Sequence, residues 1–247
     1  KIYYYDETDS TNVRASRLAE EGAEHGTLVV ADQQDAGKGR RGRGWSSLPG
    51  TGIFMTLILK PELNPSNASM LTLVAAMAVA KGITRCTGME AKIKWPNDIV
   101  YQGKKLCGIL TEMSADMDQI HYVIVGIGIN VQMTDFPKEI QNTATSLKLV
   151  TGKTLLRYKL LAKVLEEFEV LYEFVEKLPH ILKPGGRVAI LTFHSGEDRI
   201  VKKAFKEMKN SGVYEDVCRN VIRPTKEECH RNSRAKSTKM RWAIKAK

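Results

Sequence analysis

The stretch AKIKWPNDIVYQGKKLCGILTEM (residues 91–113) decides the fold of this chain. It predicts a strand, a turn at Gln102 and Gly103, and a second strand, because two runs of β-forming residues flank a pair that suits a tight turn. Residues 122–131 (YVIVGIGINV) predict a third strand. Strands that follow one another through short turns pair antiparallel, so this region predicts a largely antiparallel sheet.

Further strands and helices extend outward from this hairpin on both sides. A short strand is predicted at residues 2–5, and buried strands at residues 27–31 and 53–59. Helices are predicted at residues 13–21, 69–83 and 155–172. Clustered strands with few intervening helices indicate an α+β fold, with a mixed, largely antiparallel sheet covered by helices.

A glycine-rich basic loop, DQQDAGKGRRGRGW (residues 32–45), follows the strand at residues 27–31. Its glycines let the backbone approach a ligand closely, while Lys38, Arg40, Arg41 and Arg43 supply positive charge that suits a phosphate. The loop matches neither the dinucleotide fingerprint nor the P-loop pattern. A solvated basic hairpin tip is the alternative, because charge runs are usually wet surface.

Composition indicates a soluble globular protein of 247 residues, 43% of them hydrophobic. No run approaches the roughly 20 apolar residues of a membrane span. From the opening residues we expect no signal peptide, and the four cysteines form no Cys-x-x-Cys pair, so we expect reduced thiols and a cytoplasmic location.

The net charge of +10 is distributed very unevenly. Residues 1–176 hold 20 Lys and Arg against 21 Asp and Glu, whereas residues 177–247 hold 18 against 7. Such asymmetry marks a domain boundary and assigns any general affinity for polyanions to the C-terminal part.

Three short polar motifs carry functional groups near the ends of these elements. DSTN (residues 9–12) suits helix capping, KWPND (residues 94–98) concentrates hydrogen-bonding groups, and GIGIN (residues 126–130) allows close backbone approach. Each motif alone has a purely structural explanation.

Together, five motifs resemble the catalytic domain of biotin protein ligases in their order and spacing, over about residues 3–172. They are DSTN, QQDAGKGRRGRGW, KWPNDIVYQGKKLCGIL, GIGINV and ATSL (residues 144–147). The resemblance implies that biotin and ATP form biotinyl-5′-adenylate and pyrophosphate, after which biotin is transferred to a lysine of a biotin carrier protein. Mg²⁺ is implied as the counter-ion of ATP.

The resemblance also assigns roles to individual residues. Lys105 and Arg40 are the implied catalytic cations. The implied substrate-binding residues also include Ser10, Thr11, Asn12, Gln34, Gly37, Lys38, Gly39, Trp45 and Gly108. The implied nucleotide-binding residues are Arg40, Arg41, Lys94, Trp95, Asn97, Asp98 and Asn130.

The sequence departs from the family pattern at three points. Lys38 stands where arginine is frequent, and a lysine lacks the bidentate fork that would hold an adenylate. No DNA-binding helix-turn-helix precedes the domain, so repressor activity is not predicted. The family's small C-terminal β-barrel, expected after residue 172, has no counterpart.

The tail resembles a different family, the bacterial small-subunit rRNA cytosine-N4 methyltransferases. A helix ending at Lys183, a turn at residues 184–186, a strand at residues 187–193 and a helix at residues 197–208 predict a partial α/β segment. Residues 232–241 also match. The glycine-rich S-adenosylmethionine loop is missing, so we expect no methyl transfer. Cys218, Cys229 and His230 lack the spacing of a zinc site.

The sequence therefore predicts two domains, a ligase domain at residues 1–176 and a basic methyltransferase-like fragment at residues 177–247. A lipoate ligase is the alternative enzyme. A non-enzymatic RNA-binding remnant is the alternative from another class, because the cationic tail could bind RNA phosphates nonspecifically. Dimerisation through a sheet edge stays open.

Overall fold

The computed structural model describes residues 1–42, 44–45, 47–61, 65, 68–116, 119–192, 195–231 and 238–246. The chain divides into two compact units, Lys1–Tyr172 and Glu173–Lys247. Within the described ranges, no helix is long and apolar enough to cross a membrane.

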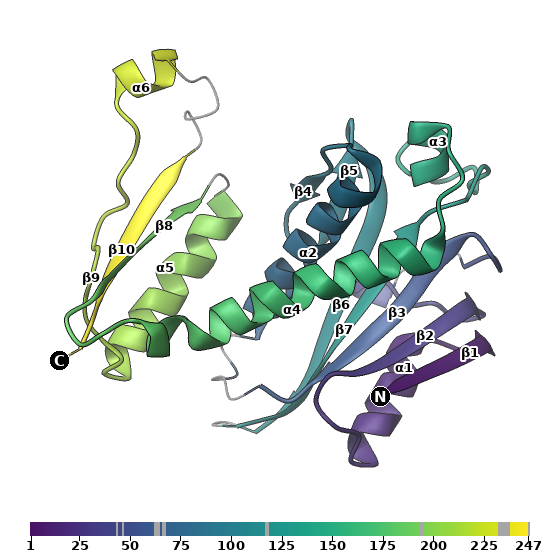
Figure 1. Cartoon of the computed structure of the whole chain (residues 1–247). Helices are drawn as coiled ribbons and strands as arrows, with labels where there is room; N and C mark the ends of the chain where they lie inside the picture. Colours follow the sequence, from purple (N-terminus) through teal and green to yellow (C-terminus); the bar gives the residue numbers. More distant parts are fainter. Residues whose placement is uncertain are drawn as a thin grey trace. The chain divides into compact units, whose positions relative to one another are not determined.

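The first unit is built on a seven-stranded sheet with the order β1-β2-β3-β7-β6-β5-β4 (Figure 1). Its strands are β1 (Ile2–Thr8), β2 (Thr27–Gln34), β3 (Gly52–Leu59), β4 (Lys92–Lys94), β5 (Asp98–Tyr101), β6 (Lys104–Ala115) and β7 (Ile120–Asn130). Only β1 and β2 pair parallel; the other neighbours are antiparallel. The predicted α+β fold with a largely antiparallel sheet is confirmed.

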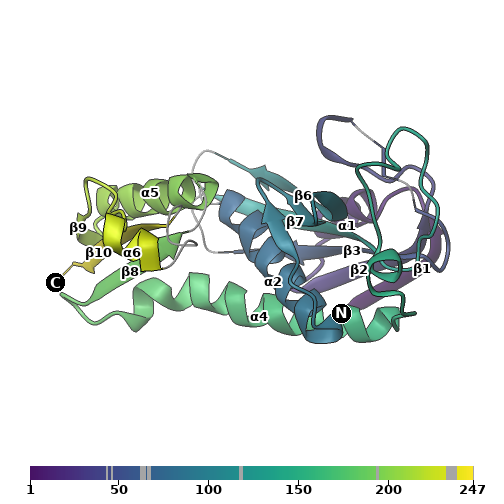
Figure 2. The same cartoon turned by 90° about the horizontal axis from the view of Figure 1, so that it is seen from above.

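Helices cover both faces of this sheet (Figures 1 and 2). They are α1 (Thr11–Glu20), α2 (Ser69–Thr87), α3 (Leu147–Thr151) and α4 (Arg157–Ile181), with a 3₁₀ turn η1 (Arg40–Gly42). On one face, Ala15 and Ala19 of α1 pack against Val29, Ile58 and Ile124. On the other face lie α2 and the first part of α4, and Thr72 of α2 donates a hydrogen bond to Thr111 of β6 at 2.8 Å.

Helix α4 differs from the sequence prediction because it is one continuous helix. The sequence predicts one helix ending at residue 172 and another ending at Lys183, but α4 runs through residue 172 to Ile181. No glycine or proline lies between residues 153 and 178, so nothing in the sequence stops the helix earlier. Its buried residues Leu160, Val164 and Phe168 recur every four positions.

Close packing and an ion pair join α2 to α4. A Cβ atom on Gly82 would lie 2.7 Å from Val164 Cγ2, so only glycine allows the two helices this approach. One turn along α4, the buried carboxylate of Glu167 pairs with Arg85 at 2.9 Å. These contacts fix the helical layer on the face of the sheet opposite α1.

The second unit holds a three-stranded antiparallel sheet with the order β8-β10-β9. Its elements are β8 (Arg187–Thr192), α5 (Ser195–Asn210), β9 (Tyr214–Val217), α6 (Lys226–Arg231) and β10 (Lys239–Lys245). The predicted strand and helix correspond to β8 and α5, whereas β9 and α6 were not predicted. The matching motif at residues 232–241 lies mostly outside the described residues.

A buried ion pair joins α5 to β10 in this unit. Arg241 donates two hydrogen bonds to the carboxylate of Asp198, at 2.7 and 3.0 Å, and its side chain is only 6% exposed. These bonds hold the pKa of Asp198 below its ordinary value. Beside them, Phe205, Tyr214 and Ala243 form a small apolar core, in which the two rings meet edge to face.

We predict that Asp198→Asn selectively loosens the second unit at neutral pH, because it leaves Arg241 buried and uncompensated at a cost of about 3–5 kcal/mol. Since the folded pKa is depressed, the pair stabilises fully above the unfolded pKa of about 3.9, and this stabilisation is lost as pH falls through the folded value. Amide hydrogen exchange of β8 and β10 should therefore show a steep acid dependence that Asp198→Asn abolishes. An unchanged acid dependence in the variant would contradict this.

Candidate active site

A floor rich in glycine lies across three neighbouring strands on the α1 face of the sheet. Phe54 of β3 pairs with Gly128 of β7, which pairs in turn with Gly108 of β6. In the next row on this face, Gly126 occupies the central strand between Thr56 and Leu110. Because the central position of each row is a glycine, the register itself opens a cavity above the sheet.

The beginning of α1 supplies one polar wall of this cavity. Ser10 is the N-cap residue, but its side chain makes no capping bond to the helix, so the capping interpretation is wrong for this hydroxyl. The backbone nitrogen and hydroxyl of Thr11 both donate to Gln34 Oε1, at 2.8 and 3.0 Å. Gln34 Nε2 lies 3.1 Å from Ser47 Oγ, on the far side of the basic loop.

Asn12 is locked against the floor by three elements. Its Nδ2 donates to Glu112 Oε2 at 2.6 Å, and its Oδ1 accepts from Thr56 Oγ1 at 2.8 Å. A Cβ atom on Gly126 would lie 2.0 Å from Asn12 Oδ1. The amide is therefore held in one orientation before any ligand arrives.

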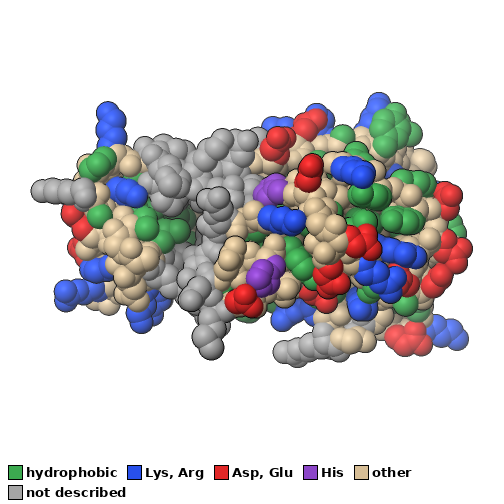
Figure 3. Space-filling model, turned by 90° about the horizontal axis from the view of Figure 1, so that it is seen from below, with side chains coloured by type: hydrophobic (Ala, Val, Ile, Leu, Met, Phe, Trp, Pro, Cys, Tyr) green, Lys and Arg blue, Asp and Glu red, His purple; other side chains and the backbone are tan. Residues whose placement is uncertain are grey.

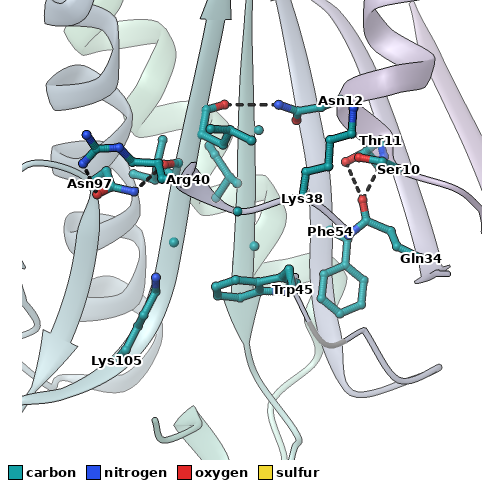
Figure 4. Close-up of a pocket in the computed structure, with 17 residues that line it drawn as sticks. Ser10, Thr11, Asn12, Gln34, Lys38, Arg40, Trp45, Phe54, Asn97 and Lys105 are labelled. Carbon is teal, nitrogen blue, oxygen red and sulfur yellow. Dashed lines mark hydrogen bonds between the residues drawn. The ribbon is translucent and has the colours of Figure 1, made fainter. Parts of the chain in front are cut away.

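The indole of Trp45 lies over the remaining two glycines (Figure 4). Cβ atoms on Gly128 and Gly108 would lie 2.7 and 2.8 Å from its ring carbons. Its Nε1 is buried and has no hydrogen-bond partner among the described residues. A buried donor without a partner is unfavourable, so an acceptor on a bound ligand would satisfy it.

Lys105 enters from the opposite side and is held at both ends. Its Nζ lies 2.7 Å from Asp98 Oδ1 and 5.2 Å from the centre of the Trp45 ring. Its backbone nitrogen donates to Thr143 O at 2.7 Å, and its carbonyl accepts from Thr145 N at 2.9 Å. The segment containing ATSL therefore fixes the strand that presents this cation.

Arg40 lies near Lys105, on the same side of the cavity. Its Nη1 donates to Asn97 Oδ1 at 3.2 Å, while Asn97 Nδ2 donates to Ile109 O at 2.8 Å. Figure 4 shows Arg40, Asn97 and Lys105 on one side of Trp45, with Ser10, Thr11 and Gln34 on the other. Arg40 and Lys105 thus give one side of the cavity positive charge, while Ser10, Thr11 and Gln34 give the other side uncharged hydrogen-bonding groups, where Figure 4 also draws Lys38.

Most residues that the sequence proposed for the site line this one cavity. They are Ser10, Thr11, Asn12, Gln34, Lys38, Gly39, Arg40, Trp45, Asn97, Lys105 and Gly108. The cavity has further lining residues that were not predicted from the sequence, namely Phe54, Ile109, Leu110, Gly126, Ile127 and Gly128. The GIGIN motif was the available signal, but strand register is needed to set its glycines opposite Phe54 and Gly108.

The structure does not place five of the proposed residues in the cavity lining: Gly37, Lys94, Trp95, Asp98 and Asn130. Gly37 packs against the Trp45 carbonyl, Asp98 pairs with Lys105, and the Trp95 side chain is 47% exposed. Asn130 is buried and donates to Thr145 O at 3.1 Å, which fastens the ATSL segment.

Two of the loop cations lie wholly or partly outside the described residues. Arg43 lies outside the described residues, as does the side chain of Arg41. Among the described residues, no group of three or more His, Cys, Asp or Glu side chains could hold a metal ion. A protein-held metal cage therefore has no support in this part of the chain.

Comparisons with known proteins identify relatives of each unit. The model of the Biotin/lipoate A/B protein ligase family matches residues 4–130, and that of the MraW methylase family matches residues 159–246. The bifunctional ligase/repressor BirA of Bacillus subtilis is 47% identical over 173 residues, covering 69% of this chain and 53% of BirA. The ribosomal RNA small subunit methyltransferase H 1 of Agathobacter rectalis is 66% identical over 80 residues, or 32% of this chain and 23% of that enzyme.

Solved structures agree with this assignment. The biotin protein ligase from Aquifex aeolicus, in complex with biotin and ATP, superposes with a TM-score of 0.61 at 36% identity, covering 78% of this chain and 82% of the other. The chain spans about half the length of the BirA relative and about a quarter of the methyltransferase relative. Because the ligase family match covers half of the chain, the chain belongs to the Biotin/lipoate A/B protein ligase family.

Proposed function

We propose that the first unit is a biotin protein ligase, which forms biotinyl-5′-adenylate from biotin and ATP and then acylates a lysine of a biotin carrier protein. The observation that carries this proposal is the cavity, with the uncharged hydrogen-bonding groups of Ser10, Thr11 and Gln34 on one side and the cations Arg40 and Lys105 on the other. Such a cavity suits a ligand with an uncharged hydrogen-bonding ring at one end and a carboxylate at the other.

The side of the cavity with Arg40 and Lys105 suits the first chemical step. A carboxylate that attacks the α-phosphate of ATP must overcome repulsion between two anions, and fixed cations lower that barrier by positioning and electrostatics. Lys105 lies where it could bridge the carboxylate and the α-phosphate. Arg40 and Lys38 could stabilise the negative charge that develops on the leaving pyrophosphate. Bond formation between carboxylate oxygen and α-phosphorus expels pyrophosphate and leaves the mixed anhydride.

We further propose that Mg²⁺ enters with ATP and is held mainly by phosphate oxygens. Asp98 is the carboxylate beside Lys105, and a single carboxylate suits a cation that keeps several waters and phosphate ligands. The ion would neutralise phosphate charge, while Lys105 and Arg40 orient the reacting groups.

A lipoate ligase would use the same reaction logic, so substrate choice needs a direct test. Pyrophosphate release should be measured with ATP and Mg²⁺, in separate assays with biotin and with lipoate. We expect release with biotin, since Thr11, Gln34 and Ser47 form a prearranged wall of uncharged polar groups. Release with lipoate alone would replace the biotin proposal, and release with neither would reject both.

We predict that Lys105→Ala lowers biotin-dependent pyrophosphate release by a factor on the order of 10²–10³, because it removes a cation that stabilises charge in the transition state. Lys104→Ala is the matched control. Lys104 is the adjacent residue of β6, is exposed and does not line the cavity, so its removal should leave the rate within about twofold. Equal rates for the wild type and Lys105→Ala would remove Lys105 from the mechanism.

For the rest of the chain, we propose that residues 1–176 form the ligase domain and residues 177–247 a basic, methyltransferase-like fragment without methyl-transfer activity. The matched part of the Agathobacter relative is only 23% of that enzyme, which supports a fragment. A homodimer would form through β1 or β4, the two edges of the large sheet.

We also propose that the second unit binds RNA nonspecifically. Figure 3 shows Lys and Arg side chains on the surface of this unit, at left. The exposed cations of its described residues include Arg187, Lys206, Arg219, Arg223 and Lys226. Their charge can release counterions from RNA phosphates, which makes binding strong only at low salt.

We predict that the triple variant Arg219→Glu, Arg223→Glu, Lys226→Glu weakens binding of single-stranded RNA at low salt. Loss of three phosphate contacts should reduce the slope of log K against log salt by about 2. The control carries the same reversals at exposed Lys60, Lys92 and Lys138 of the first unit, and should bind nearly as well as the wild type. If the control alone loses affinity, RNA binds the ligase unit.

A further inference from the structure

One guanidinium group touches the chain on both sides of the connection that carries the basic loop. Asp32 lies two residues before the end of β2, and its Oδ1 accepts a short hydrogen bond from Arg157 Nη1. The same nitrogen donates to the carbonyl of Gly52, the first residue of β3, at 3.0 Å. Arg157 is the first residue of α4, so this contact fastens the entry and exit of the loop to a helix.

Asp32 also bridges the two ends of the connection directly. Its second oxygen, Oδ2, accepts from the backbone nitrogen of Gly50 at 3.0 Å. Arg157 and Asp32 are 35% and 22% exposed in their side chains, so the pair is only partly covered. Neither residue lines the cavity.

The ends held by Arg157 lead directly to groups that do line the cavity. A Cβ atom on Gly52 would lie 2.4 Å from Phe54 Cζ, so the Phe54 ring packs across the residue whose carbonyl Arg157 binds. Further along the connection, Trp45 N donates to Gly37 O at 2.8 Å. The first contact lies where the connection enters β3, and the second closes the base of the segment that presents Lys38, Arg40 and Trp45.

We propose that Arg157 is a positioning residue for the basic loop: by holding Asp32 and Gly52 together, it fixes where Lys38, Arg40 and Trp45 return over the cavity. The expected effect on adenylate retention rests on the proposed function. The ordering of the loop by Arg157 does not depend on that function. A loop with fixed ends has fewer conformations to lose when it closes on a ligand, so its cations are easier to place. Arg157 itself would touch neither substrate.

The first test needs no ligand and uses the full chain. Arg157→Ala should accelerate amide hydrogen exchange at Gly50 and Trp45 on the order of tenfold, while amides in the middle of β3 and β7 keep their wild-type rates. Arg85→Ala is the matched control. It also removes an arginine that pairs with a carboxylate, but this pair joins Arg85 of α2 to Glu167 of α4 and does not involve the loop. This control should leave Gly50 and Trp45 unchanged.

Arg157→Lys is the rescue variant. A single ammonium group can still reach both Asp32 and the Gly52 carbonyl, so exchange at Gly50 should return most of the way to the wild-type rate. Unchanged exchange at Gly50 and Trp45 in Arg157→Ala would overturn the proposal. Equal acceleration throughout the sheet would also overturn it, because that pattern means general destabilisation.

The second test measures retention of the adenylate. Chasing preformed, labelled biotinyl-5′-adenylate with unlabelled adenylate should show release about 10-fold faster or more from Arg157→Ala than from the wild type or from Arg85→Ala, with recovery in Arg157→Lys. Equal release rates would overturn the positioning role. If the wild type forms no adenylate, the proposed function fails, and the exchange experiment still decides whether Arg157 orders the loop.

Discussion

The site depends on one constraint, the register that sets Gly128 between Phe54 and Gly108 and puts Gly126 in the next row. Any side chain at Gly128 would collide with Trp45, and any at Gly126 with Asn12. Because a slip of one residue would exchange these glycines for isoleucine or valine, the register cannot drift without filling the cavity. The burial of Val125 and Ile129 on the opposite face enforces that register with the hydrophobic energy of the core.

The cations of the site are restrained by contacts weak enough for a ligand to replace. Lys105 and Asp98 are 34% and 25% exposed, and a partly exposed ion pair contributes roughly 0–1 kcal/mol. A polyphosphate carries more charge than one carboxylate, so under the proposed function ATP would compete with Asp98 for Lys105. The Trp45 ring occupies the space above Gly128 and Gly108, so a ligand group that lies directly on these glycines would have to displace it. Ligand entry thus exchanges internal contacts for ligand contacts.

Sequence reasoning predicted what is local and missed what depends on pairing across the fold. The predicted turn at Gln102 and Gly103 joins β5 to β6, and both of its central residues have positive φ. The single strand predicted before this turn is wrong, because residues 95–97 turn the chain between β4 and β5, which pair antiparallel. Asn130 shows the limit of prediction from local sequence. Its amide suits a nucleotide, yet in the structure it donates to Thr145 O, and no pattern near residue 130 indicates that contact. The bond between Arg157 and Asp32 joins residues 125 positions apart and has no local signature.

Helix α4 explains physically how one chain can carry segments related to two families. Each backbone hydrogen bond of a helix closes within four residues, so a junction inside a helix leaves no backbone group without its partner. A junction inside a sheet would instead leave a strand edge unpaired. Leu160, Val164 and Phe168 bury the first part of α4 against the ligase unit, and the contacts of the chain divide farther along, after Tyr172. The helix therefore needs only its first turns to complete the ligase core, and its remaining turns can lead into any sequence that continues a helix.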